Sequence, residues 1–149
     1  MRPIFWLCAT FLLLSCDLRP SADDAAMQAA VHWAEAYFNY DFHEAARYAT
    51  DESGRWLQFA ASNATEQQLQ LLRNTAEGAT VEVDDFFATA NDTLRVVTLH
   101  VNHFVAPTAL GDSARLTDEA SFQVTTVLRN GEWKVRMEGL PRSEKQSLD

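Results

Sequence analysis

The chain has 149 residues, with 21 acidic side chains against 12 lysines and arginines and a formal net charge of −9. This acidic balance and the lack of basic clusters argue against nucleic acid as a partner, because phosphate binding needs grouped Lys and Arg side chains. The length suits a single domain with its own hydrophobic core.

The N-terminus has the pattern of a secretory signal. Arg2 supplies a positive start, and an apolar run follows over residues 4–14. The run is shorter than the about 20 apolar residues that a membrane-spanning helix needs, so it predicts a signal rather than a permanent helix in the membrane. Residues 13–16, Leu-Leu-Ser-Cys, resemble the lipobox of bacterial lipoproteins. The alternative is an ordinary secretory signal followed by a chance cysteine.

The lipobox resemblance implies removal of residues 1–15 and attachment of acyl chains, such as palmitate, to Cys16. The protein would then be anchored in a bacterial cell envelope, on the periplasmic or surface side, with the outer membrane favoured over the inner. Cys8 is lost with the signal, so the mature chain is expected to hold no disulfide. Arg2 is lost as well, and the more acidic product depends on its acyl chains to stay on an anionic membrane.

Residues 16–24 are polar and predict a lipidated tether, after which helical periodicity begins at Ala25. An apolar face that runs to Phe38 predicts an amphipathic helix. Its expected solvated stripe is Gln28, His32, Glu35 and Asn39.

Two further helices are predicted from capping-box patterns. Asp41 is followed at the third position by Glu44, and Thr65 is followed in the same way by Gln68. Gly78 is the expected C-terminal stop of the later helix.

After Gly78 the apolar period changes from 3.6 to 2, which predicts strands. Three more strands are expected over residues 93–105, 115–129 and 132–138, joined as antiparallel hairpins. The Asn130-Gly131 pair favours a two-residue type I′ turn. The pairs expected across it are Leu128 with Trp133, Thr126 with Val135, and Val124 with Met137.

The turn at Asn91-Asp92 joins the first two predicted strands, and it does not by itself determine which of their residues lie opposite each other. A two-residue loop there would place apolar residues of one strand opposite polar residues of the other, for example Val83 opposite His100. An odd-numbered loop or a bulge would instead pair Phe87 with Val97 and Val83 with Val101.

Helices followed by a four-stranded antiparallel meander predict an α+β domain over residues 25–138, with a polar tail over 139–149. The pattern resembles the nuclear transport factor 2-like, or cystatin-like, superfamily of cone-shaped domains, and more narrowly the small bacterial lipoproteins that carry one. The resemblance lies in Ala34-Glu-Ala-Tyr-Phe38, in residues 40–49 and in Asn130-Gly-Glu-Trp-Lys-Val135. It implies N-terminal helices packed on a curved sheet, with a pocket that relatives use for binding or for catalysis.

Two polar residues, Asp85 and His103, fall in the apolar phase of their strands, which predicts a place in a pocket or near a solvent-exposed strand end. With Tyr37 they are the catalytic candidates, Asp85 as general base and His103 as acid or hydrogen-bond donor. The phase-matched register places Asp85 opposite Leu99, about 13 Å from His103 at about 3.3 Å per residue, which is too far for a hydrogen-bonded dyad. The alternative is that both are rim residues.

The candidate ligand-binding residues are Trp33, Tyr37, Trp56, His103 and Trp133. For the aromatic ones the alternative is packing in the core. His100 and His103 would point to opposite faces of a strand, and no HExxH spacing is present, so neither a metal nor another cofactor is expected.

Two short segments, Asp92-Thr93-Leu94 and Asp112-Ser113-Ala114, resemble the O-glycosylation motif of some exported Gram-negative proteins. Both fall at predicted turns, so Thr93 and Ser113 are candidate modification sites.

The sequence favours a non-enzymatic envelope lipoprotein whose domain binds a small apolar ligand or an envelope partner protein. The alternative is a pocket enzyme that performs acid–base chemistry, of isomerase, dehydratase or hydrolase type, on a hydrophobic small molecule. A third hypothesis is an accessory subunit that makes contacts through an exposed sheet face with Gln123, Thr125 and His100.

Overall fold

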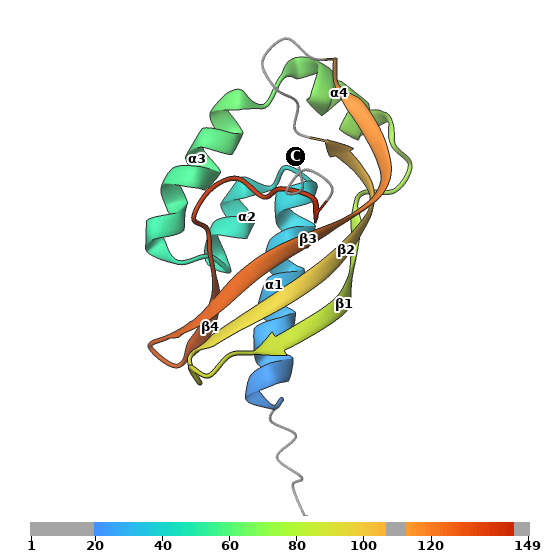
Figure 1. The fold of residues 1–149 in the computed structure, drawn as a ribbon. Helices are drawn as coiled ribbons and strands as arrows, with labels where there is room; N and C mark the ends of the chain where they lie inside the picture. Colours follow the sequence, from blue (N-terminus) through green and yellow to red (C-terminus); the bar gives the residue numbers. More distant parts are fainter. Residues whose placement is uncertain (1–19, 107–112, 145–149) are drawn as a thin grey trace, which may run out of the picture.

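The computed structural model describes residues 20–106 and 113–144, so the signal segment, Cys16 and Asp112 lie outside the described residues. Helices come first and strands second, which confirms the predicted α+β class (Figure 1). The helical elements are α1 (Ala22–Phe38), α2 (Phe42–Arg47), the 3-10 turn η1 (Asp51–Ser53), α3 (Gly54–Asn63) and α4 (Glu66–Asn74). The strands are β1 (Thr80–Ala88), β2 (Leu94–Ala106), β3 (Arg115–Arg129) and β4 (Glu132–Arg136).

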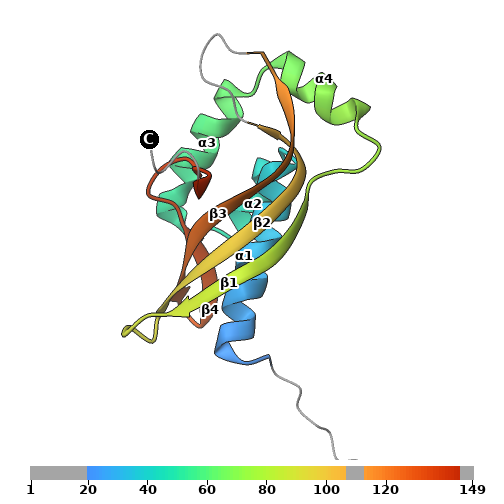
Figure 2. The same ribbon diagram turned by 45° about the vertical axis from the view of Figure 1, so that its right-hand side comes forward.

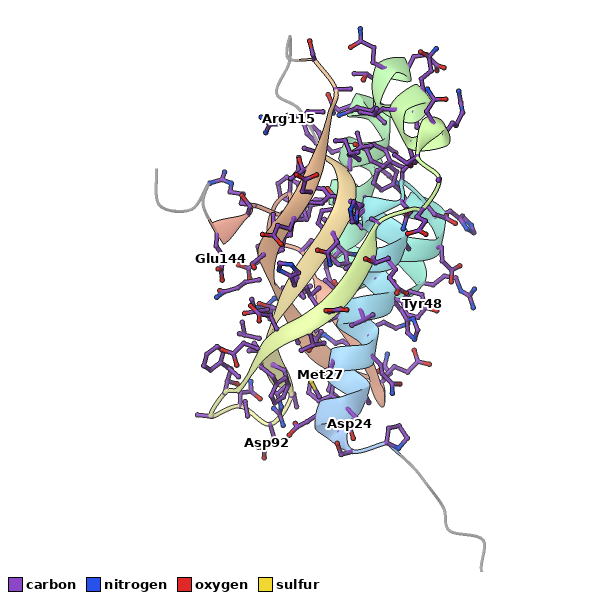
Figure 3. The ribbon with its side chains drawn as sticks, turned by 90° about the vertical axis from the view of Figure 1, so that its right-hand side faces the viewer. Asp24, Met27, Tyr48, Asp92, Arg115 and Glu144 are labelled. Atoms are coloured by element: carbon purple, nitrogen blue, oxygen red, sulfur yellow. The ribbon has the colours of Figure 1, made fainter. Side chains whose placement is uncertain are left out.

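The four strands form one antiparallel sheet in the order β1-β2-β3-β4. The sheet is curved, and α1 lies against its concave side, where it contacts all four strands (Figure 1). Figure 2 shows α4 beyond the end of β2 and β3 that is far from the start of α1. The helices lie on one face of the sheet, and no helix of the described ranges covers the opposite, outer face (Figure 3).

The core forms where the apolar side of α1 meets the concave face of the sheet. Phe38 is at its centre, with ring centroids 5.2 Å from Phe104 on β2 and 4.6 Å from Phe122 on β3. All three side chains are buried, and burial of each contributes on the order of 1.5–3 kcal/mol to folding. A second cluster, which includes Ala26 and Trp133, extends the core toward the N-terminus of α1.

The first helix begins at Ala22, three residues before the predicted start at Ala25. Ser21 and Asp24 form a complete capping box: Ser21 Oγ accepts from the Asp24 N–H, and the Asp24 carboxylate accepts from the Ser21 N–H. The predicted tether includes both capping residues, and in the structure they belong to the start of the helix instead. Among the helices that the structure describes, none is long and apolar enough to cross a membrane.

The C-terminal end of α1 is joined to the start of β1 by Asn39. Its Nδ2 donates to the carbonyl of Ala79 at 3.0 Å, and its Oδ1 accepts from the Ala79 N–H at 2.8 Å. Asn39 is therefore not the solvated residue that the helical stripe predicted. Gly78 is not the helix stop either, because α4 ends at Asn74. A Cβ at Gly78 would overlap the Asn39 amide, which explains the glycine there.

The Asn130-Gly131 hairpin has the predicted register, with Leu128 opposite Trp133 and Thr126 opposite Val135. Asn130 and Gly131 both have positive φ angles, as a type I′ turn requires. The ladder ends at Arg136, so the predicted pairing that involves Met137 is not part of it.

The register between β1 and β2 differs from the prediction. A bulge between Val83 and Asp85 leaves Asp84 without an opposing residue. Val83 lies opposite Leu99 rather than Val101. Phe87 lies opposite Val96 rather than Val97. A bulge was one of the two solutions expected, but its position inside β1 could not be deduced from alternation alone.

Candidate ligand-binding cavity

The sheet opens between β3 and the chain that follows β4. In a continuous ladder Phe122 would lie opposite Gly139, but it pairs with Ser143 instead. The intervening residues 137–142 leave the edge of β3 and return to it, so the predicted polar tail is partly built into the fold. Glu144 then lies on the side of the sheet away from α1 (Figure 3).

This opening forms a cavity of about 280 Å³, here called the β3–β4 cavity. It is bounded by residues 123–125 of β3, by residues 135–142 and by Trp33 of α1. Trp33 is 1% exposed, so it forms the floor from the core side. Val124, Val135 and Met137 are buried apolar neighbours. The volume lies just below the range of about 300–1,000 Å³ that is usual for drug-sized ligands.

Two buried N–H groups on the lining of this cavity have no hydrogen-bond partner among the described residues. They are Nε1 of Trp33 and Nε of Arg136. The Arg136 guanidinium is partly engaged, because its Nη2 lies 3.1 Å from Oε1 of Glu138. A buried donor without an acceptor costs about 1–3 kcal/mol of folding free energy.

A buried polar network holds the inner wall of the cavity in place. The backbone of Val135 exchanges hydrogen bonds with residues 48–50, where Ala49 and Val135 form a parallel bridge. Ser53 is fully buried, and its Oγ accepts from the Met137 N–H at 2.8 Å. Thr50 Oγ1 lies 2.8 Å from Ser53 Oγ. The free edge of β4 is thus covered, and the backbone at Val135 and Met137 is fixed.

Tyr37 stacks on Trp33 with ring centroids 4.9 Å apart, and it is 4% exposed. Burial, together with the neighbouring Tyr40 hydroxyl, raises the pKa of the Tyr37 phenol above its usual value. Its hydroxyl therefore stays protonated at neutral pH and does not have the properties of a general base. Its place is in the core beneath the cavity rather than on the cavity wall.

Asp85 and His103 both lie on the exposed surface, and neither lines the β3–β4 cavity. Each is turned outward by a backbone irregularity. The bulge before Asp85 places it opposite Thr98 and turns Phe86 inward, while His103 has a φ of 52° and is followed by the buried Phe104. Strict alternation along β1 and β2 would place both residues in the apolar phase, and these two irregularities break that alternation.

The other aromatic candidates are distributed over the fold. Trp56 is half-buried beside the main core, and its Nε1 also has no partner within the described ranges. Trp133 belongs to the second core cluster, where the guanidinium of Arg95 lies 5.3 Å from its ring centroid. Of the predicted ligand-binding residues, Trp33 lines the β3–β4 cavity. Arg136 lines it as well, although no pattern in the sequence predicts a site there.

The two candidate glycosylation residues are exposed and lie at opposite ends of the sheet. The Thr93 hydroxyl donates to Oδ1 of Asn91 at 2.7 Å within the hairpin between β1 and β2. That hairpin lies at the same end of the molecule as the start of α1, as Asp92 and Asp24 show in Figure 3. Ser113 lies just before Arg115, which marks the other end in Figure 3.

A metal centre would need several ligating side chains close together. Over residues 20–106 and 113–144, no group of three His, Cys, Asp or Glu residues lies close enough to hold a metal ion. His100 lies 3.3 Å from Glu119 on the outer face, which is a two-residue contact.

No family model matches the sequence. No curated protein matches it either. Among solved structures, the chain is similar to an "Ntf2 like protein involved in plasmid conjugation", with 15% sequence identity and a TM-score of 0.32. The match covers 79% of this chain and 48% of that protein, so the chain spans about half of its length.

Proposed function

We propose that this protein is a lipid-anchored cell-envelope lipoprotein of the nuclear transport factor 2-like type, and that its domain binds a small ligand in the β3–β4 cavity without transforming it. The observation that carries the binding role is the β3–β4 cavity itself, about 280 Å³ in volume, which is open to the outside and has the buried side chains of Trp33, Val124 and Val135 on its core side. The mixed polar and apolar lining favours an amphipathic ligand rather than the purely apolar one expected from the sequence.

The chemistry of the lining supports a binding role over catalysis. Among the residues that line the cavity, Glu138 is the only carboxylate, it is exposed, and it is paired with Arg136. Neither His nor Cys belongs to this lining. General acid–base catalysis needs a positioned group with a pKa matched to proton transfer, and arginine stays protonated.

Native mass spectrometry of the protein purified from its own membranes tests the binding role. We expect a retained small molecule on the wild-type protein. The Trp33→Phe variant, which makes the aromatic floor of the cavity smaller, should retain less of it. A matched control is Trp133→Phe, in the second core cluster away from the cavity. If all three preparations carry nothing, the binding role is wrong.

The anchor is tested separately. Replacement of the lipobox cysteine, Cys16→Ala, should abolish acyl labelling and release the protein from the membrane fraction. Cys8→Ala is the matched control, because Cys8 lies within the segment expected to be removed. Membrane retention of the Cys16→Ala variant would overturn the anchoring proposal while leaving ligand binding open to its own test.

A further inference from the structure

We infer that the end of the domain where α1 begins lies against the bilayer surface and that Phe87 of β1 contacts the lipids there. This inference rests on the proposed lipid anchor at Cys16, and it adds the orientation of the domain on the membrane. It follows from the length of chain between Cys16 and α1, from the apolar side chains beside the first hairpin and from the charge at this end of the fold.

The chain between the proposed anchor and the fold is short. α1 begins at Ala22 and is capped by Ser21, which follows Cys16 by only five residues. Five fully extended residues span at most about 18 Å. Acyl chains on Cys16 would therefore keep the first turn of α1 within about 18 Å of the lipids that hold them.

The two hairpins of the sheet lie at the same end of the fold as the start of α1 (Figure 1). The Leu128 N–H donates to the carbonyl of Thr93 at 2.8 Å, which places the end of β3 beside the hairpin between β1 and β2. Residues 21–24, 89–95 and 128–134 together form this surface, here called the anchor end. A bilayer within reach of the anchor would meet the anchor end first.

Phe87 is a large apolar side chain beside the anchor end, and it is 52% exposed. It lies opposite Val96 in the ladder between β1 and β2. Leu94 and Val96 are partly exposed and flank Arg95, whose side chain reaches α1. Alternation therefore turns Leu94 and Val96 to the outer face together with Phe87, and no helix of the described ranges covers that face. An aromatic ring in such a position can leave water by entering the boundary between headgroups and acyl chains.

The charge of the anchor end permits a close approach to lipid. It has three basic and four acidic residues, a formal charge of −1, whereas the whole chain carries −9. Asp23 is paired with Arg95, and Glu132 is paired with Lys134. Asp85 is the nearest carboxylate on the outer face of β1, and it lies two residues farther from the hairpin than Phe87. This distribution suits a zwitterionic surface, because it offers no net positive charge to anionic headgroups.

The test locates two sites relative to lipid in vesicles. Cys16 is expected to be acylated and Cys8 removed, so one introduced cysteine can carry a fluorescent label, either Asp92→Cys at the anchor end or Arg115→Cys at the opposite end (Figure 3). The full-length processed protein is placed in phosphatidylcholine vesicles that contain a doxyl-labelled phosphatidylcholine as quencher. We expect the label at position 92 to be quenched and the label at position 115 to keep its fluorescence.

The contribution of Phe87 is measured in the Asp92→Cys protein. Phe87→Ser should lower the ratio of docked to undocked molecules by on the order of fivefold, because about half of the Phe87 side chain is available to leave water on docking. Leu116→Ser is the matched control, since Leu116 is 39% exposed and lies beside Arg115. It should leave the quenching unchanged. Thermal unfolding of each variant shows whether the fold is retained.

Three outcomes would contradict the inference in different ways. If the protein carries lipid but both labels are quenched equally, or neither is, or Phe87→Ser has no effect, the docking is wrong and the anchor stands. If Phe87→Ser instead dissociates a dimer seen by sedimentation in detergent micelles, the surface around Phe87 binds a second copy rather than lipid. If mass spectrometry finds no acyl chain on Cys16, the anchor and the docking fail together.

Discussion

Arg95, near the start of β2, donates from Nε to Oδ1 of Asp23 at 2.9 Å, which joins this end of the sheet to the first turn of α1. The Arg95 side chain is mostly buried, and its Nη1 also donates to the carbonyls of residues 91, 92 and 94 in the hairpin between β1 and β2. One guanidinium thus links α1, β2 and the β1–β2 hairpin at the end of the fold where α1 begins.

Replacement of this arginine should cost more stability than replacement of its carboxylate partner. Arg95→Met leaves several carbonyls unpaired, and we expect the free energy of unfolding to fall by about 2–4 kcal/mol. Asp23 is about half exposed, so Asp23→Asn should cost only about 0.5–1 kcal/mol. Urea titration measures both. Equal losses for the two variants would show that the carbonyl contacts contribute nothing.

Ser53 should be a stability residue that also acts on the cavity. Ser53→Ala removes the acceptor of the buried Met137 N–H, and we expect a loss of about 1–3 kcal/mol together with weaker ligand retention. Ser62→Ala is the matched control, because the exposed Ser62 hydroxyl only donates to the carbonyl of Gln58. Chemical denaturation of the two variants gives the comparison, and similar midpoints would refute the role assigned to Ser53.

Gly78 and Gly54 should respond to alanine in opposite directions. At Gly78 the added Cβ would meet the Asn39 amide and break its two hydrogen bonds to Ala79, with an expected loss of about 1–3 kcal/mol. At Gly54 nothing lies within 4 Å, and its φ of −53° is helical. There the alanine should stabilise the fold by about 0.4–1 kcal/mol. Thermal unfolding would contradict this explanation if Gly78→Ala were as stable as the wild type.

Alkaline pH should destabilise the fold through its buried phenols. Burial raises the pKa of Tyr40 from 10.0 to about 12, so its neutral form is favoured in the folded state. Stability from this group is complete below about pH 10 and is lost as the pH rises toward about 12. Tyr40→Phe should flatten the fall in unfolding free energy over that range. It should also lose a little stability at neutral pH, since the Tyr40 hydroxyl donates to the Val105 carbonyl at 3.2 Å. Denaturation at a series of pH values distinguishes the two effects.

Local signals in the sequence predicted the local parts of the fold well. The hairpin at Asn130-Gly131 has the predicted register because two residues with positive φ determine a tight turn by themselves. The capping box of Thr65 and Gln68 likewise starts α4 where expected. Both features depend on residues within a few positions of one another, so one stretch of sequence contains the whole cause.

The failures share a different cause. Asp85 points outward because of the bulge before it, and His103 points outward because its own φ angle is positive. Neither irregularity can be read from the alternation of apolar and polar residues along a strand. The β3–β4 cavity exists because Ser143 pairs with Phe122 far back in the chain, after residues 137–142 have left the sheet. A long-range pairing of this kind has no counterpart in local periodicity, so the sequence predicted a polar tail and missed Arg136.

The bulge in β1 also affects how copies of this protein meet one another. β4 is covered along its edge by residues 48–50, whereas β1 is the terminal strand on the other side of the sheet. At the bulge that strand carries exposed Asp84 and Asp85, with the exposed Glu82 nearby. Two molecules approaching by this strand would oppose carboxylate to carboxylate, and the extra residue would break their hydrogen-bond ladder. Crowded copies would thus resist joining their sheets into a continuous aggregate.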